Sequence, residues 1–139
     1  MWEDVEAIKK LKARYERCVD VKDWDGFRQV FTDDVVWDTR STGATIITGA
    51  DEVTEFVKSN LDAALCVHHC HMPEIELLSP TTAEGVWASE DVIRWPDGTQ
   101  LHGWGHYHET YEKIDGEWRI KTLRFDEIRA DFTKTEEMK

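Results

Sequence analysis

The segment LCVHHCHM, residues 65–72, marks the point at which the chain changes its periodicity. Cys66, His68 and Cys70 occupy alternate positions in it, so on a β-strand they share one face. Strand-like segments continue from there to the end, separated by turn signals such as Pro-Asp-Gly and Asp-Gly, at residues 75–78, 83–95, 100–114 and 118–125. We therefore expect a meander-like, antiparallel sheet from residue 65 onward.

The sequence before residue 65 has helical periodicity instead. Apolar side chains recur at three- and four-residue steps between Val5 and Val19, as on one face of an amphipathic helix. Asp23 can cap a short second helix, residues 35–37 read as a strand, and Gly49 precedes a third helix with an acidic first turn. Helices first and strands afterwards predict an α+β fold in which a curved sheet wraps the helices.

The overall composition excludes several classes of function. A chain of 139 residues has the size of one domain, and its formal net charge of −12 repels phosphate backbones and anionic membrane surfaces. We expect no nucleic-acid partner and no membrane partner. The N-terminus has no signal-peptide pattern and no apolar run is long enough to span a bilayer, so we expect a cytoplasmic protein. The domain is predicted to end near residue 132, with a frayed tail over residues 133–139.

Four stretches of sequence resemble a known family. They are residues 13–20 (ARYERCVD), 22–25 (KDWD), 67–75 (VHHCHMPEI) and 111–118 (YEKIDGEW). Together they resemble the SnoaL-like branch of the nuclear transport factor 2-like superfamily, which includes scytalone dehydratase and bile-acid 7α-dehydratase. The resemblance implies a cone-shaped barrel, made of a curved and mostly antiparallel sheet closed by three N-terminal helices, with a deep pocket inside.

The resemblance also implies site residues. The dehydratases of this branch use an Asp at the end of the first helix and a His on the first strand of the sheet, which match Asp20 and His68, and the bile-acid enzyme adds a Tyr that matches Tyr15. There are two departures from the pattern. The strand at residues 83–95 has no counterpart of the second catalytic His of scytalone dehydratase, and Arg124 is only a displaced substitute for the C-terminal Arg of the bile-acid enzyme.

Further substrate contacts are expected at three positions. Cys66 matches a Cys that lindane dehydrochlorinase has two residues before its His, and Tyr107 matches a pocket position of scytalone dehydratase. Trp37 is one of seven tryptophans, and aromatic side chains line pockets for flat apolar ligands. The resemblance implies no cofactor, and the set Cys66, His68 and Cys70 lacks a fourth ligand and loop-type spacing, so we expect no metal.

The residue types suit the elimination of water. An imidazole can remove a proton beside a carbonyl and then protonate the departing hydroxyl, while a carboxylate such as Asp20 orients the ring and stabilises its charged form. Tyr15 would donate a hydrogen bond to the enolate oxygen. The residues alone favour a solvated carboxylate at Asp20, because five residues place it roughly 140° from Tyr15 on an ideal helix unless it lies at the helix end. Tyr15 could equally be a core tyrosine, and it is the resemblance that favours a catalytic pair.

The histidines of the longest predicted strand are expected outside the pocket. His102, His106 and His108 share a face with Trp104, opposite Gly105 and Tyr107. We expect that face to be the convex surface of the sheet or a subunit contact. Association would cover it, so we expect a homo-oligomer, with a trimer favoured over a dimer.

We therefore predict a cofactor-independent lyase, a dehydratase, that removes water from a small hydrophobic substrate with a hydroxylated steroid- or polyketide-like ring. Two alternatives use the same pocket: a dehydrohalogenase, and a ketosteroid-type isomerase or cyclase in which Asp20 acts as the base. An alternative of another class is a non-catalytic ligand-binding or assembly module, because one fold hosts many functions.

Overall fold

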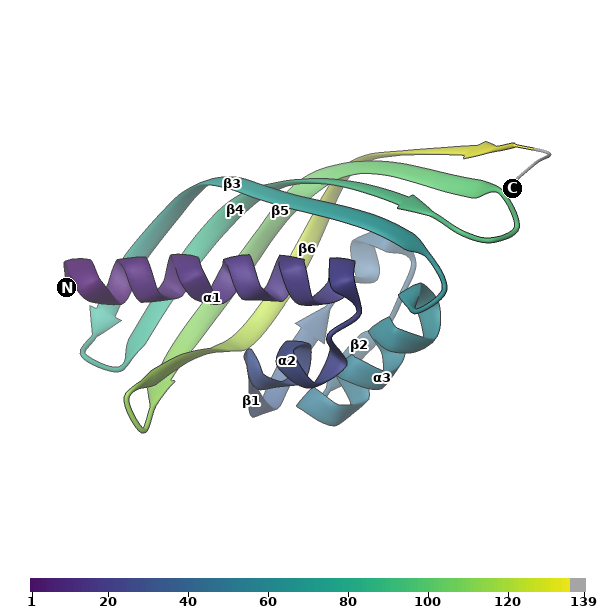
Figure 1. The fold of residues 1–139 in the computed structure, drawn as a ribbon. Helices are drawn as coiled ribbons and strands as arrows, with labels where there is room; N and C mark the ends of the chain where they lie inside the picture. The colour runs from purple at the N-terminus through teal and green to yellow at the C-terminus, as the bar shows by residue number, and fades with distance from the viewer. Residues whose placement is uncertain (136–139) are drawn as a thin grey trace.

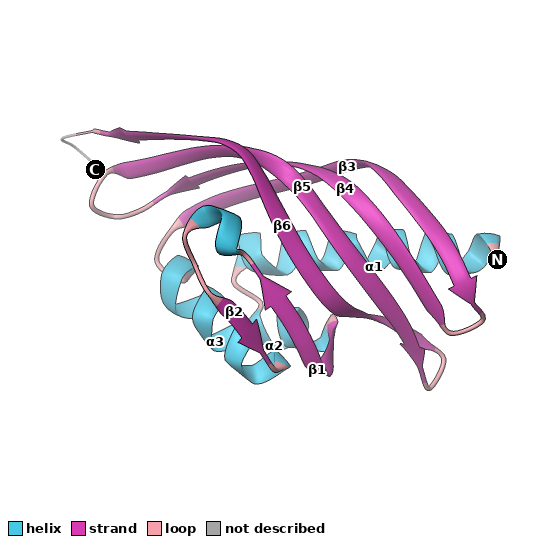
Figure 2. Cartoon of the chain, turned by 180° about the vertical axis from the view of Figure 1, so that it is seen from behind, coloured by secondary structure: helices cyan, strands magenta, loops and turns pink. Residues whose placement is uncertain are grey.

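A computed structural model describes residues 1–135 of the protein as a six-stranded sheet with three α-helices on its concave side (Figures 1 and 2). In chain order the elements are α1 (Trp2–Val21), α2 (Trp24–Gln29), β1 (Phe31–Asp38), the 3₁₀ turn η1 (Arg40–Thr42), β2 (Ile46–Thr48), α3 (Ala50–Leu61), β3 (Leu65–Ser79), β4 (Thr82–Arg94), β5 (Thr99–Ile114) and β6 (Glu117–Lys134).

The sheet order is β2-β1-β6-β5-β4-β3. All neighbours are antiparallel except β1 and β6, which are parallel. The α+β class and the predicted meander from residue 65 are thereby confirmed. The sheet curves strongly but has two free edges, β2 and β3, so it is not the closed barrel that the resemblance implied.

Three details differ from the predicted elements. The segments expected at residues 65–72 and 75–78 form one strand, β3, with a register irregularity between His71 and Glu74 beside Met72, whose φ is 49°. The short strand β2 was not predicted. Thr133 and Lys134, which were expected to belong to the frayed tail, pair with Gln100 and Thr99, so β6 continues to Lys134. Residues 136–139 lie outside the described residues.

The helices begin and end as local chemistry dictates. The first turn of α1 carries Glu3 and Asp4, whose negative charges favour a helix N-terminus. The helix ends at Lys22, whose left-handed conformation (φ 65°) directs its N–H to the carbonyls of Cys18 and Val19. Asp23 caps α2 as predicted, because its side chain accepts a hydrogen bond from the Gly26 N–H at 2.9 Å.

The bend of the sheet depends on a close approach at Gly105. A Cβ atom at this position would lie 2.4 Å from the ring of Phe125 and 2.5 Å from the carbonyl of Asp126. The register between β5 and β6 shifts at the same place, between Trp104 and Gly105. Glycine at a bulge lets the two strands bend together and curve the sheet over the helices.

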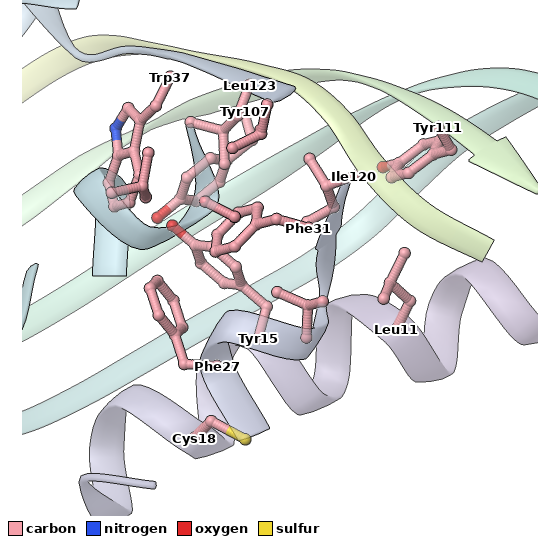
Figure 3. Packing of buried hydrophobic residues seen from close by; sticks show 14 of the residues in the cluster. Leu11, Tyr15, Cys18, Phe27, Phe31, Trp37, Tyr107, Tyr111, Ile120 and Leu123 are labelled. Atoms are coloured by element: carbon pink, nitrogen blue, oxygen red, sulfur yellow. The ribbon is translucent and has the colours of Figure 1, made fainter. Parts of the chain in front are cut away.

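The core lies between α1, α2 and the concave face of the sheet (Figure 3). Its aromatic centre packs Tyr15 against Phe27, Phe31 and Tyr107, with ring centroids 5.3, 5.9 and 5.8 Å apart. The large apolar area that such rings bury holds α1 against the sheet and so determines where its C-terminal turn lies. No helix within residues 1–135 is long and apolar enough to cross a membrane.

Candidate active site

The C-terminal half of α1 lies along β3 and is joined to it by three polar contacts. The Cys70 thiol donates to Glu16 Oε1 at 2.8 Å, His68 contacts Asp20, and Lys22 Nζ donates to Cys66 Sγ at 3.1 Å. The residue numbers rise along α1 while they fall along β3, so the contacts form the rungs of an antiparallel ladder. We call this set of contacts the α1–β3 ladder.

The middle rung joins Asp20 and His68 twice. Asp20 Oδ1 lies 2.7 Å from His68 Nδ1, and Asp20 Oδ2 accepts the backbone N–H of His68 at 3.0 Å. Asp20 belongs to the last turn of α1, as its position relative to Tyr15 required. Because one carboxylate holds both the ring and the backbone, the imidazole has one orientation and its Nε2 is left for other partners.

The surroundings of His68 make it more basic than an ordinary histidine. Burial acts to lower its pKa, since its side chain is only 9 % exposed. The hydrogen bond with Asp20 and the negative charges of Asp91 and Glu16 act in the opposite direction and are stronger, so the pKa lies above its ordinary value of 6.5. The ring is therefore a stronger proton acceptor than an ordinary imidazole.

His68 faces a cavity of about 430 Å³ between α1, α3, η1 and the sheet. This volume falls within the range of about 300–1,000 Å³ that is usual for small-molecule sites. Most of the wall is apolar or aromatic, and besides two tyrosines its ionisable side chains are His68, Asp91 and Glu127. Phe56 of α3 remains 36 % exposed although its helix packs on the core, because its ring forms part of this wall and stands edge-on to Trp37.

Two tyrosine side chains in the cavity wall carry hydroxyl groups. Figure 3 shows the phenolic oxygens of Tyr15 and Tyr107 turned toward each other. Burial raises the pKa of both phenols well above 10, although a hydrogen bond from Tyr107 acts to lower that of Tyr15, so both remain neutral donors. Trp37 Nε1 is buried and has no hydrogen-bond partner within residues 1–135.

Five of the seven predicted site residues come together. Tyr15, Trp37, His68 and Tyr107 line the cavity, and Asp20 stands behind His68. Cys66 does not line it: the thiol packs with Ala64 and Ile93 and accepts from Lys22, so its expected substrate contact is corrected. Arg124 is also corrected, because it lies on the convex face beside His108 and pairs with Asp126 at 3.1 Å.

Asp91 is a wall residue that sequence reasoning missed. It lies on β4 directly opposite His68 on β3, and its face of the strand also carries the buried Trp87 and Ile93. The sequence did contain a sign of it, because Asp91 is an acidic residue at one of the alternate strand positions whose other side chains face inward. Burial raises the pKa of Asp91, more strongly than the nearby His68 lowers it.

A second ionic cluster lies deeper along α1. Lys12 Nζ contacts Glu109 Oε2 at 2.7 Å, with both side chains at most 1 % exposed, and it also lies 3.7 Å from Glu16. Glu109 Oε1 accepts from the Tyr111 hydroxyl, which itself accepts from Trp87 Nε1. We call Lys12, Glu109, Tyr111 and Trp87 the Lys12 network. Between α1 and β3 a groove lined by Lys12, Glu16 and Cys70 reaches His68 from the side opposite the cavity.

The histidines of β5 lie on the convex face. His102 stacks on Trp104 with ring centroids 4.1 Å apart and contacts Glu90, and His108 lies 3.2 Å from Asp126. The opposite face of β5 carries Tyr107 and Tyr111 toward the core. Within residues 1–135, no group of three or more His, Cys, Asp or Glu side chains is arranged to hold a metal ion.

The curved sheet, the helices in its concavity and the histidine–carboxylate pair at the cavity are the arrangement that the resemblance to the nuclear transport factor 2-like superfamily predicted. Within that superfamily, the SnoaL-like domain family matches residues 1–124, and the chain belongs to that family.

The relatives include proteins with several enzyme names. "Probable cyclase FGR4" of Gibberella zeae is 23% identical over 137 residues, which cover 87% of this chain and 89% of that protein. The crystal structure of a type 2 hexachlorocyclohexane dehydrochlorinase, LinA, is similar with a TM-score of 0.86 and 17% identity, covering 95% of this chain and 90% of that one. A scytalone dehydratase-like protein from Novosphingobium aromaticivorans has a TM-score of 0.86 and 18% identity, with 94% and 87% covered. At these identities the two structures show the fold alone.

Proposed function

We propose that the protein is a cofactor-independent lyase, a dehydratase that removes water from a hydroxylated ring compound bound in the 430 Å³ cavity. The observation that carries this proposal is the orientation of His68. Its Nδ1 is held by Asp20 at 2.7 Å, while the ring lines a cavity whose wall is mostly apolar. A proton acceptor with one free nitrogen in such a wall suits the removal of a carbon-bound proton.

The reaction begins with neutral His68. Its Nε2 takes a proton from the carbon next to a substrate carbonyl, and Asp20 stabilises the imidazolium that forms. The electrons left on that carbon shift toward the carbonyl oxygen. The C–O bond at the β-carbon then breaks as the departing oxygen takes up a proton from the imidazolium, which leaves a C=C bond, water and neutral His68. Asp20 is a positioning residue here, since its carboxylate touches His68 and not the cavity.

The developing negative charge on the carbonyl oxygen needs hydrogen-bond donors. Tyr15 is a neutral phenol in the cavity wall. Removing one such donor typically costs about 3 kcal/mol of transition-state stabilisation. This hydroxyl group therefore supports a substrate that carries a ring ketone or a related oxygen.

A screen with paired variants tests the proposal. The wild type is incubated with hydroxylated ring ketones and ring acids, and loss of water is followed by mass spectrometry. We expect His68→Ala and Asp20→Asn each to lower kcat/KM by about 10²–10⁴-fold on the hit, and the double variant to be little worse than either single one. Asp126→Asn, on the convex face, is the control and should retain activity.

Both variants should fold. Asp20 keeps 23 % of its side-chain surface exposed, so its charge remains hydrated when His68 is removed. Thermal midpoints close to that of the wild type would establish this. Additive losses in the double variant would show that the two residues do not act as a unit, and the mechanism would be wrong.

Two other activities use the same pocket. The likeness to the dehydrochlorinase favours loss of HCl from a ring as the second candidate, because the same base serves when chloride leaves. The relative named as a cyclase favours an isomerisation or ring closure, in which a proton is moved and nothing is lost. Product mass separates them: loss of water, loss of HCl, or an unchanged mass.

We also propose that the protein is a homo-oligomer, with a trimer favoured. The convex face carries the exposed apolar side chains of Leu65 and Val67 on β3 and the stacked pair of His102 and Trp104 on β5. Such a patch on a chain of this size is usually covered. Sedimentation at neutral pH tests this, and a monomer would contradict it.

A further inference from the structure

Asp91 is placed for chemistry that the pair of Asp20 and His68 does not supply. It is the direct cross-strand partner of His68, and residues so paired have Cβ atoms about 4.5–5.5 Å apart. Both side chains line the same cavity. The hydroxyl of Ser89 donates to Asp91 Oδ1 at 3.2 Å, and within residues 1–135 it is the one hydrogen-bond donor to this carboxyl group.

The carboxyl group of Asp91 is not needed to orient the ring of His68. Asp20 already holds the ring and the backbone of His68. A second carboxylate in a mostly apolar wall costs free energy unless it is paired, and the contact with Ser89 is a long hydrogen bond. A carboxyl group in this position avoids most of the cost when it carries a proton, and burial does raise the pKa of Asp91.

We propose that Asp91 is the acid that protonates the departing hydroxyl group, while His68 takes the proton from carbon; this assignment rests on the proposed function. It divides between two residues the work that a single histidine would otherwise do in turn. The leaving oxygen and the carbon-bound hydrogen would lie on the same side of the substrate ring, facing the β3–β4 pair.

The step balances in protons and electrons. The C–H bond breaks, its proton goes to His68 Nε2, and its electron pair becomes the new C=C bond. The C–O bond breaks with both electrons on oxygen, which accepts the Asp91 proton and leaves as water. The site is left with imidazolium and carboxylate side by side, and a proton passing from His68 to Asp91 restores the starting state.

The surrounding charges decide which form of the pair is present. His68 faces Asp20 and Glu16 from α1, with Lys12 beyond them, and Glu127 of β6 lines the same cavity. The negative groups among them favour the charged form of His68 and oppose ionisation of Asp91, whereas Lys12 favours ionised Asp91. An apolar ring that displaces water from the cavity favours the neutral pair, which is the reactive form, because charges lose their hydration.

The leaving group tests the assignment. We compare a ring ketone carrying a β-hydroxyl group with its β-chloro counterpart, each measured above its uncatalysed rate. Asp91→Asn should lower kcat/KM for the hydroxy compound by about 10²–10⁴-fold and for the chloro compound by less than about tenfold, because chloride leaves without a proton. His68→Ala should impair both. Equal losses on the two compounds with Asp91→Asn, or no loss on either, would overturn the assignment.

A second measurement needs no substrate. The NMR titration of His68 in Asp91→Asn should move to lower pH than in the wild type, because a negative neighbour has been removed. Glu90→Gln is the matched control: it is the adjacent residue on β4, faces the convex side and contacts His102, so it should leave that titration in place. An unchanged titration of His68 in Asp91→Asn would overturn the role proposed for Asp91. Absence of turnover with every substrate would contradict the lyase function, and the titration would still test the interaction of the two residues.

Discussion

The Lys12 network and the His68 site are both clusters of buried charge along α1, and they differ in what their polar atoms face. In the Lys12 network each carboxylate oxygen of Glu109 accepts a hydrogen bond from the protein. Lys12 donates to one oxygen and Tyr111 to the other, and Trp87 donates to the tyrosine hydroxyl. At the site, one nitrogen of His68 is held by Asp20 and the ring faces a cavity.

Buried charge alone therefore does not mark an active site. Lys12 is more deeply buried than His68, and its pKa lies above 10.5 because the attraction of Glu109 and other groups exceeds the effect of burial. A lysine held in its charged form can stabilise the fold but cannot exchange protons near neutral pH. The group that can change its charge, with a free atom toward a cavity, is the one suited to chemistry.

The largest expected effect is on stability, in the Lys12 network. Lys12→Met should lower the free energy of unfolding by about 3–5 kcal/mol, because it leaves the buried carboxyl group of Glu109 without its cationic partner. Urea denaturation measures this. Lys9→Met is the control, since Lys9 lies on the exposed side of the same helix and its pair with Glu6 should contribute about 0–1 kcal/mol. Similar losses in the two variants would remove the distinction between the regions.

Two tyrosines sharpen the comparison. Tyr15→Phe should reduce kcat by about 10²–10³-fold with little change in stability, because it removes one donor from the cavity. Tyr111→Phe should leave kcat nearly unchanged but cost about 1–3 kcal/mol of stability, since Glu109 and Trp87 each lose a partner. Activity assays and thermal unfolding of both variants check this. The reverse pattern would show that the regions have been assigned to the wrong roles.

A smaller effect is expected on the pH dependence of stability. The pKa of His68 is higher in the folded protein than its ordinary value of 6.5. Its stabilisation is therefore fully present below about pH 6.5 and is lost as the pH rises through the raised pKa. Unfolding free energies of the wild type and His68→Gln should converge from mildly acidic to alkaline pH. A difference that grows with pH would contradict the sign of the shift.

No effect is expected from metal removal. Dialysis against a strong chelator should leave activity unchanged, and elemental analysis should find metal well below one ion per chain. The reason is the proposed chemistry, in which His68 and the carboxyl groups move the protons themselves. Stoichiometric zinc, with activity lost on its removal, would contradict this.

Alternation along the strands predicted which side chains share a face, and the structure agrees where the strands are regular. His68 faces inward with Cys66 and Cys70, and the histidines of β5 face outward. The same reasoning shows why Arg124 was a wrong choice. Leu123 and Phe125 are buried on either side of it, so Arg124 must point to the opposite face. The family resemblance had outweighed a pattern that was already visible.

The contact between Asp20 and His68 could not be predicted from the residues alone. The two are 48 positions apart, and the direction of Asp20 depends on how α1 ends at Lys22. The resemblance supplied the pairing that local pattern lacks. Asp91 was missed because strand propensity does not tell which residue of one strand lies opposite a given residue of the next. The pairing of His68 with Asp91 follows from the register of the β3–β4 hairpin.

The α1–β3 ladder has a consequence for how such a protein diversifies. Its rungs hold His68 between α1 and β3, whereas Trp37 and Phe56, which also line the cavity, come from β1 and α3. Replacements in β1 and α3 can alter the shape of the cavity without disturbing the rungs. On the proposed function, related chains could therefore keep the proton-transferring residues and change their substrate by a few substitutions in β1 and α3.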